Sequence, residues 1–243
     1  MTKRKKVTLI SNVCIVFVLL GLGIAVFTAD LANVFISVNA PLAHGDRNNG
    51  RVSVMFAICE DERVRDVNDI LDRLDGVDAT FFISGSWANR NQDTVRRIAK
   101  DFEIGNHGFN HRALANLNER DQRNELQSAH TMIRTITSTT KVTEGENGVD
   151  VQQNTAVSMS LFLPPHGSFN KRTLRAAESL GYTTVMWSRD ARTDVMMNAT
   201  SGILSGDFIL LRPNFATLSV INNILNEYRR QNLTVVSVGN HIK

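Results

Sequence analysis

The sequence predicts an α/β fold, a distorted (β/α) barrel preceded by one N-terminal transmembrane helix. Between residues 51 and 243, short apolar runs alternate with longer amphipathic stretches, which is the pattern of strands followed by helices. This alternation implies a parallel sheet, and about seven such units favour a closed or nearly closed barrel over an open sheet. Ahead of this region, residues 7–29 carry no charged side chain.

Strands and helices alternate along the whole expected domain. The strands are expected at 52–58, 79–83, 103–105, 161–163, 183–187, 208–211 and 234–238. The helices are expected at 64–74, 94–100, 120–137, 171–180, 195–204 and 218–230. Residues 138–160 interrupt the pattern because they are polar and rich in Thr, Gly, Asn and Gln. They are expected to form a long surface excursion, either a solvated insertion or a specificity loop.

Residues 1–30 are expected to form a basic cytoplasmic tip and a membrane anchor. At about 1.5 Å per helical residue, the uncharged stretch 7–29 covers the roughly 30 Å of bilayer hydrocarbon. The cluster Lys3-Arg4-Lys5-Lys6 precedes it and should stay in the cytoplasm, so the rest of the chain should face outside. A cleaved signal peptide is the alternative, although no convincing pair of small residues ends the apolar stretch. A tether is expected over 31–50 and the folded domain over 51–243.

Charge and cysteine content argue against a nucleic-acid-binding protein and against a disulfide-stabilised domain. The formal net charge is +3, and the four cations of the N-terminal cluster account for it, so no basic surface for nucleic acid is expected. The two cysteines, Cys14 in the expected span and Cys59 in the outer domain, are on different sides of the membrane boundary. The domain should therefore fold without a disulfide.

Polar side chains follow several expected strands, at the end of the barrel where chemistry is usually found. Five segments lie there: Phe56–Cys59, Asn106–His111, Leu163–Gly167, Trp187–Asp190 and Leu210–Arg212. The second is the most informative, because its two imidazoles, His107 and His111, are four residues apart and can chelate one divalent metal.

In this order, the segments resemble the motifs of the polysaccharide deacetylase (NodB homology) family, most closely its PdaB-type sporulation members. The stretches Ala79–Ala88, Glu103–His111, Pro164–Phe169 and Gly206–Leu211 carry most of the likeness, which covers about residues 51–240. The resemblance implies metal-dependent removal of N-acetyl groups from amino-sugar polymers at the envelope of a spore-forming Gram-positive cell. Peptidoglycan or another N-acetylated glycan is the implied ligand, and the sequence does not identify a protein partner.

Position by position, the resemblance implies a degenerate active site. Ala57 and Ile58 stand where the family has its general base and a metal-binding aspartate, and PdaB-type members already lack the second carboxylate. Leu163 replaces the family's arginine, and Arg212 replaces the histidine that acts as general acid. An arginine stays protonated, and losing one proton-transfer partner costs about 10²- to 10⁴-fold in rate. We therefore expect an inactive or severely impaired member that binds peptidoglycan or a partner.

The metal site leaves two interpretations open. His107 and His111 match the family's metal ligands, which implies one divalent metal, zinc first, but two donors alone bind it weakly or not at all. With Cys59 as third ligand and a displaced base from Glu60–Glu62, the site would instead be rebuilt, and the chain would be an active metal-dependent N-deacetylase. Otherwise the imidazoles are structural and Cys59 is a small buried hydrophobe.

Other side chains at this face are candidates for binding a ligand: His166, Trp187, Arg189 and Arg192. The two arginines with Arg212 would make the face positive and suited to anionic wall polymers, unless they are ordinary solvated loop cations. Trp187 is expected either to stack on a sugar ring or, like Trp87, to pack in the core. Asp190 matches the family's orienting aspartate and is either a relic of it or a loop-capping carboxylate.

Overall fold

The computed structural model describes residues 40–144 and 150–243, and Ala40–Lys243 form one compact unit. The membrane span expected over 7–29 and the tether residues 31–39 lie outside the described residues. Within these ranges, none of the helices has the length and apolar character needed to cross a bilayer.

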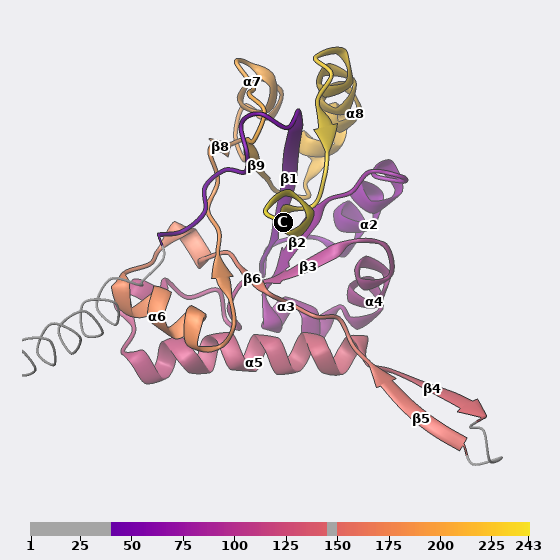
Figure 1. Cartoon of the computed structure of the whole chain (residues 1–243), viewed down its shortest axis with the longest axis vertical. Coiled ribbons are helices and arrows are strands. Elements are labelled where there is room, and N and C mark those ends of the chain that lie inside the picture. Colours follow the sequence, from indigo (N-terminus) through magenta and orange to yellow (C-terminus); the bar gives the residue numbers. More distant parts are fainter. Residues whose placement is uncertain (1–39, 145–149) are drawn as a thin grey trace, which may run out of the picture. The chain divides into compact units, whose positions relative to one another are not determined.

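A parallel sheet of eight strands forms the centre of the domain, which confirms the α/β prediction (Figure 1). Its strands are β1 (Arg51–Ile58), β2 (Thr80–Ile83), β3 (Glu103–Asn106), β6 (Leu161–Phe162), β7 (Thr183–Thr184), β8 (Arg189–Asp190), β9 (Phe208–Leu211) and β10 (Thr234–Val235). They follow the order β7-β6-β3-β2-β1-β9-β8, and β10 pairs with the start of β1. Among the described residues β7 and β8 do not pair, so the sheet is a curled half-barrel and not a closed one.

Helices begin close to where the sequence places them. They are α2 (Val64–Arg73), α3 (Gly85–Arg90), α4 (Gln92–Asp101), α5 (Glu119–Thr137), α6 (Lys171–Ser179), α7 (Val195–Thr200), α8 (Phe215–Arg230) and α9 (Val238–His241), with 3-10 turns at Leu114–Asn116 and Pro165–Gly167. Asn118, Asn170 and Asn214 cap α5, α6 and α8 by accepting from backbone N–H groups of the first turn. The cap explains why α8 begins at Phe215, three residues before the expected start.

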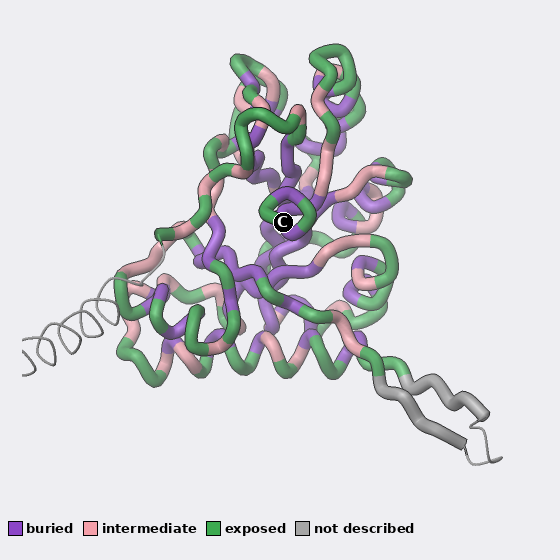
Figure 2. Tube along the Cα trace, in the orientation of Figure 1, coloured by how far each residue is buried: buried purple, intermediate pink, exposed green. Residues whose placement is uncertain are grey.

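Two apolar layers hold these elements together. Along β1, Val54 and Phe56 face the larger layer, which α2, α4, α5 and α8 cover, whereas Met55 and Ala57 face the inside of the curl. Figure 2 shows the sheet as a nearly continuous buried region. Trp87 is 1% exposed, as the packing interpretation predicts.

The polar stretch 138–160 contains a hairpin of its own. Strands β4 (Thr139–Glu144) and β5 (Asp150–Thr155) pair with each other in antiparallel fashion and not with the main sheet. The hairpin therefore interrupts the alternation of strands and helices after α5. The alternation resumes at β6 (Figure 1).

Part of the expected tether is built into the fold. Leu42 bridges Val185 beyond the edge strand β7, and His44 bridges Asp207 before β9, so this segment connects the two ends of the sheet's strand order. Gly45 N donates to the Gly206 carbonyl at 2.8 Å. Gly206 has φ +87°, and a Cβ there would lie 2.8 Å from the Gly45 oxygen, so the close approach requires glycine.

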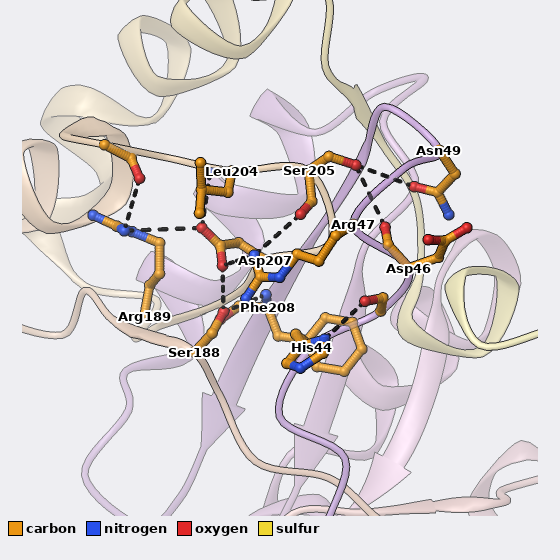
Figure 3. A network of polar contacts seen from close by, with 12 residues as sticks. His44, Asp46, Arg47, Asn49, Ser188, Arg189, Leu204, Ser205, Asp207 and Phe208 are labelled. Atoms are coloured by element: carbon orange, nitrogen blue, oxygen red, sulfur yellow. Dashed lines mark hydrogen bonds and ion pairs between the residues drawn. The ribbon is translucent and has the colours of Figure 1, made fainter.

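Asp207, which directly precedes β9, binds this segment through hydrogen bonds and an ion pair (Figure 3). One carboxylate oxygen accepts from Arg47 Nη1 at 2.6 Å and from Ser188 Oγ at 2.8 Å, and the other accepts from Leu204 N at 2.9 Å. Arg189 Nη1 lies 3.8 Å from the second oxygen. The network joins the N-terminal segment to β8 and β9.

Candidate functional site

A pocket of about 170 Å³ opens where the parallel strands end. Its walls come from all five segments singled out in the sequence: Ala57, Cys59, Asp61, His107, His111, Leu163, Pro164, His166, Gly167, Trp187, Arg192, Leu210 and Arg212. Arg189 and Asp190 are not among them. Nine of the eleven candidate site residues named from the sequence therefore line one pocket.

His107 is held as a neutral imidazole. Its Nδ1 lies 2.7 Å from the Leu163 carbonyl oxygen, and since that oxygen only accepts, Nδ1 carries the proton. The ring is 3% exposed. Burial, with a smaller contribution from His111, lowers the pKa of His107 to about 3. Nε2 is therefore an unprotonated acceptor at any physiological pH.

The loop that carries both histidines is held by Asn106, which belongs to the segment singled out in the sequence, and by Glu125, which the sequence did not indicate. Asn106 is fully buried and donates to Leu126 O at 2.9 Å and Tyr182 Oη at 3.0 Å, while its oxygen accepts from Gly108 N. Glu125 on α5 accepts from the backbone N–H groups of Phe109 and Asn110. Nothing in the sequence separates Glu125 from the other polar residues of an amphipathic helix.

The imidazole of His111 lies between those of His107 and His166, and the rings are tilted against each other. The ring centroids of His111 and His107 are 4.9 Å apart, and those of His111 and His166 are 4.3 Å apart. His166 Nε2 donates to the His111 carbonyl oxygen at 3.0 Å, so this nitrogen is already engaged. Burial, and next the charge of His166, lower the pKa of His111.

The residues present do not fit the metal site that the family implies. In the ranges that the structure covers, no three His, Cys, Asp or Glu side chains are placed to share an ion. Burial, together with a hydrogen bond to Glu62, raises the pKa of Cys59 to about 12, so its sulfur is a thiol and not a thiolate ligand. Among the described residues the Cys59–His107–His111 centre is therefore not assembled.

The positions of the family's base and acid carry no free proton-transfer group. Ala57 is 7% exposed and presents a methyl group. Arg212 Nε donates to Glu62 Oε1 at 2.5 Å, and the other Glu62 oxygen accepts from Cys59 N at 2.8 Å. Glu62, a candidate displaced base, therefore has both oxygens engaged. Burial opposes the charge of Arg212, but the hydrogen bond and charge of Glu62 outweigh it, and the pKa of Arg212 is raised.

Asp190 pairs with Arg192, two residues farther along the chain. Arg192 donates through Nε and Nη2 to the two Asp190 oxygens, at 2.8 and 2.5 Å, and this hydrogen bonding lowers the pKa of Asp190. The same guanidinium lies over the Trp187 ring, 5.0 Å from its centroid. Asp190 is thus outside the pocket wall but orients a residue within it.

The arginines do not make the pocket a positive surface, which is one of the two interpretations that the sequence leaves open. Arg192 is paired with Asp190 and Arg212 with Glu62, and Asp61 adds a carboxylate to the pocket lining that has no ion-pair partner within 40–144 and 150–243. Arg189 points elsewhere: its guanidinium donates to the carbonyl oxygens of Asn198, Ser201 and Gly202 at the end of α7. The local charge balance therefore favours a neutral ligand over an anionic one.

Residues 44–143 match the family model described as polysaccharide deacetylase. The chain carries a polysaccharide deacetylase family domain. It is 28% identical over 163 residues to the uncharacterized protein YlxY of Bacillus subtilis, covering 63% of this chain and 45% of that protein. It is also 28% identical over 124 residues to a peptidoglycan-N-acetylglucosamine deacetylase of Bacillus cereus, covering 50% of this chain and 38% of that enzyme. The matches thus span about half the length of these curated relatives or less.

Solved structures of this family share the fold. The wild-type protein BA3943 of Bacillus anthracis, described as a pseudoenzyme of carbohydrate esterase family 4, aligns with a TM-score of 0.72 and 23% identity over 84% of this chain and 69% of that one. The Bc1960 peptidoglycan N-acetylglucosamine deacetylase aligns with a TM-score of 0.69 and 21% identity over 83% of this chain and 92% of that one. A mutant of BA3943 is described as having restored enzymatic activity.

Proposed function

We propose that this domain binds the intact acetamido group of N-acetylated amino-sugar glycans, such as peptidoglycan, without hydrolysing it. One observation carries the proposal: the pocket keeps the imidazole acceptor and the apolar wall, but Ala57 and the Arg212–Glu62 ion pair occupy the positions of base and acid. Amide cleavage requires a group that takes up or delivers a proton, and neither position supplies one.

The lining offers a partner for each part of an acetamido group. The unprotonated Nε2 of His107 can accept the amide N–H. The hydrogen bonds described for Arg192 and Arg212 use Nε and Nη2, so among the described residues Nη1 of each is left to donate to the carbonyl oxygen. Leu163 and Leu210, with Ala57, supply an apolar surface for the methyl group. A carboxylate ligand is disfavoured because the anions around the pocket outnumber its cations.

Calorimetry with the full-length chain in detergent tests this function. We expect oligomers of N-acetylglucosamine to bind and oligomers of glucosamine to bind at least tenfold more weakly, since the deacetylated sugar has no carbonyl oxygen or methyl group for the pocket. Arg192→Ala should weaken binding of the acetylated oligomer about tenfold, equivalent to ~1.4 kcal/mol. Arg175→Ala, at an exposed position of α6, is the matched control and should change nothing. Equal binding of the two glycans, or none, would contradict the proposal.

The alternative is a metal-dependent N-deacetylase, and it has its own measurement. The chain is incubated with zinc, cobalt or manganese, and acetate released from N-acetylglucosamine oligomers is measured. We expect no release above that of the His107→Ala variant. Metal-dependent turnover that disappears in His107→Ala, or in Asp61→Asn at the pocket rim, would replace the binding function by catalysis.

We also propose that the domain is displayed outside the cell membrane of a spore-forming host through the segment 7–29. The uncharged segment and the basic cluster before it support this topology. The B. cereus relative, whose name places its substrate in peptidoglycan, supports a wall ligand. Protease added to intact protoplasts should digest the domain and leave a membrane-bound N-terminal fragment. A protected domain, or one released into the medium, would refute the topology.

A further inference from the structure

A chain of hydrogen bonds connects the surface of α5 to the loop that carries the pocket histidines. Nδ1 of His130, a partly buried residue of α5, lies 2.5 Å from the Tyr182 hydroxyl oxygen. That oxygen accepts from Asn106 Nδ2 at 3.0 Å, and Asn106 Oδ1 accepts from Gly108 N at 2.8 Å. The three side chains come from α5, the turn before β7 and the end of β3, and they lie outside the pocket lining.

The partners of Asn106 fix the direction of each proton in this chain. The Leu126 carbonyl can only accept and the Gly108 N–H can only donate, so the amide between them has one orientation. Its Nδ2 faces Tyr182, whose hydroxyl oxygen therefore accepts, and the hydroxyl proton is free to bond elsewhere. Among the described residues, His130 Nδ1 is the acceptor within reach. Nδ1 of His130 thus carries no proton, and the ring is neutral.

Protonation of His130 is incompatible with this arrangement. A charged imidazole carries a proton on both nitrogens, so Nδ1 would face Tyr182 as a second donor. Tyr182 is 5% exposed, and its hydroxyl proton would then be buried without an acceptor, which is costly. Burial, and next the charge of Arg134 one turn along α5, lower the pKa of His130 and favour the neutral ring. No charged side chain of α3, α4, α6 or β3, the elements packed against α5, contributes in the part of the chain described, Glu178 of α6 included.

The other end of the chain of hydrogen bonds positions His107. The backbone oxygen of Asn106 accepts from Leu163 N at 3.0 Å, and the Leu163 carbonyl accepts from His107 Nδ1 at 2.7 Å. The direction of His107 Nε2 therefore depends on Leu163 and, through it, on Asn106. A shift of Asn106 would reduce the fraction of molecules in which Nε2 is placed to accept from a ligand, and the apparent affinity falls with that fraction.

We propose that Tyr182 and His130 are positioning residues of the pocket, and that the protein binds its ligand more weakly when His130 takes up a proton. The inference rests on the proposed function, since the group that is displaced is the His107 acceptor of the acetamido N–H. The coupling is reciprocal, so a bound ligand must hinder protonation of His130 by the same factor by which the proton weakens binding.

Binding of the N-acetylglucosamine trimer to the full-length chain in detergent, measured by calorimetry from pH 8 to 5, tests the coupling. The variant His130→Asn keeps an acceptor near the position of Nδ1 but takes up no proton in this range. As pH falls, the affinity of wild type should decrease about threefold more than that of His130→Asn, the equivalent of one lost hydrogen bond. Both proteins keep His111 and His166, so any pH dependence that these cause is common to the two.

Tyr182→Phe removes the hydroxyl group that joins His130 to Asn106. Its affinity for the trimer should be about threefold below that of wild type at pH 8, because one hydrogen bond of Asn106 is lost. Its pH profile should run parallel to that of His130→Asn, since the proton on the imidazole no longer reaches the loop. His44→Asn is the matched control: it makes the same replacement at an exposed position outside the pocket lining and should keep the wild-type profile.

A second measurement uses wild type alone. NMR titration of the His130 ring in histidine-labelled protein, with and without the trimer, should give a lower pKa in the complex. Equal pH profiles for wild type and His130→Asn, or a His130 pKa that the trimer does not change, would overturn the coupling, while binding of the trimer keeps the proposed function. Absence of binding at every pH would overturn both.

Discussion

Replacing Arg47 by alanine should loosen the N-terminal segment from the sheet. The Asp207 carboxylate is 3% exposed and is reached by Arg47 Nη1 at 2.6 Å, by Ser188 Oγ and by Leu204 N. The variant removes the nearest cation from a buried carboxylate and also the bond from Arg47 to the Ser205 carbonyl at 3.0 Å. What remains is a buried charge with two hydrogen bonds and a more distant guanidinium, that of Arg189.

The expected loss in the free energy of unfolding depends on how far the Arg47–Asp207 ion pair is exposed to solvent. Removing one partner of a fully buried ion pair costs about 3–5 kcal/mol. The Arg47 side chain is 36% exposed, so solvent screens it, and the remaining donors still stabilise Asp207. We expect a loss of about 1–2 kcal/mol in the free energy of unfolding. For a domain of this size each kcal/mol lowers Tm by about 2–4 °C, so the expected drop is about 2–8 °C.

The effect should also depend on pH in a defined direction. Burial opposes ionisation of Asp207, but the hydrogen bonds from Leu204, Arg47 and Ser188 outweigh it, so its folded-state pKa lies below the ordinary value. A lowered carboxyl pKa stabilises the fold above the unfolded-state pKa of about 3.9, and this contribution is lost as pH falls through the folded-state pKa. The difference between wild type and Arg47→Ala should therefore be constant from pH 7 to 5 and shrink below about pH 4.

Thermal unfolding followed by circular dichroism, from pH 7 to 3, measures both quantities. Arg175→Ala, which removes an exposed arginine without touching Asp207, is the control and should unfold as wild type does. Equal Tm values for Arg47→Ala and Arg175→Ala at pH 7 would refute the role of the ion pair. A difference in Tm between wild type and Arg47→Ala that is as large at pH 3 as at pH 7 would refute the role of the Asp207 charge.

Four other variants separate the roles of residues near the pocket. Arg212→Ala leaves Glu62 buried without its cation and should cost about 3 kcal/mol in urea unfolding. Glu62→Gln leaves a half-exposed Arg212 and should cost about 1–2 kcal/mol, so equal losses would contradict this asymmetry. Asn106→Ala removes three hydrogen bonds from a fully buried amide and should cost about 2–3 kcal/mol; a loss below 0.5 kcal/mol, roughly that of a surface change, would show that the histidine loop holds without it. Restoring base and acid together, by Ala57→Asp with Arg212→His, should release more acetate than either single change, and a single variant as active as the double would count against the assigned roles.

Local sequence determined most of the elements and the family of this protein. The strands and helices lie near their expected places because each depends on its own run of apolar residues, as in β1 and α5, and on caps such as Asn118. The His107 and His111 spacing and the residues at strand ends identified the pocket, since parallel strands bring their ends together whatever the loops do. Local pattern did not indicate α3 or β8, which have six and two residues and carry too little periodicity to be recognised.

Tertiary structure decided which charges meet. Glu62 and Arg212 are 150 residues apart in the chain, and only the pairing of β1 with β9 brings them within 2.5 Å. The same holds for Arg47 and Asp207, whose contact incorporates a segment that looks like a tether in sequence. The type of a side chain determines which hydrogen bonds it can donate or accept. Its partner depends on the order of the strands and the conformation of the loops. For this reason the arginines that could have made the pocket positive are paired in the fold, and His107 beside them is a neutral acceptor.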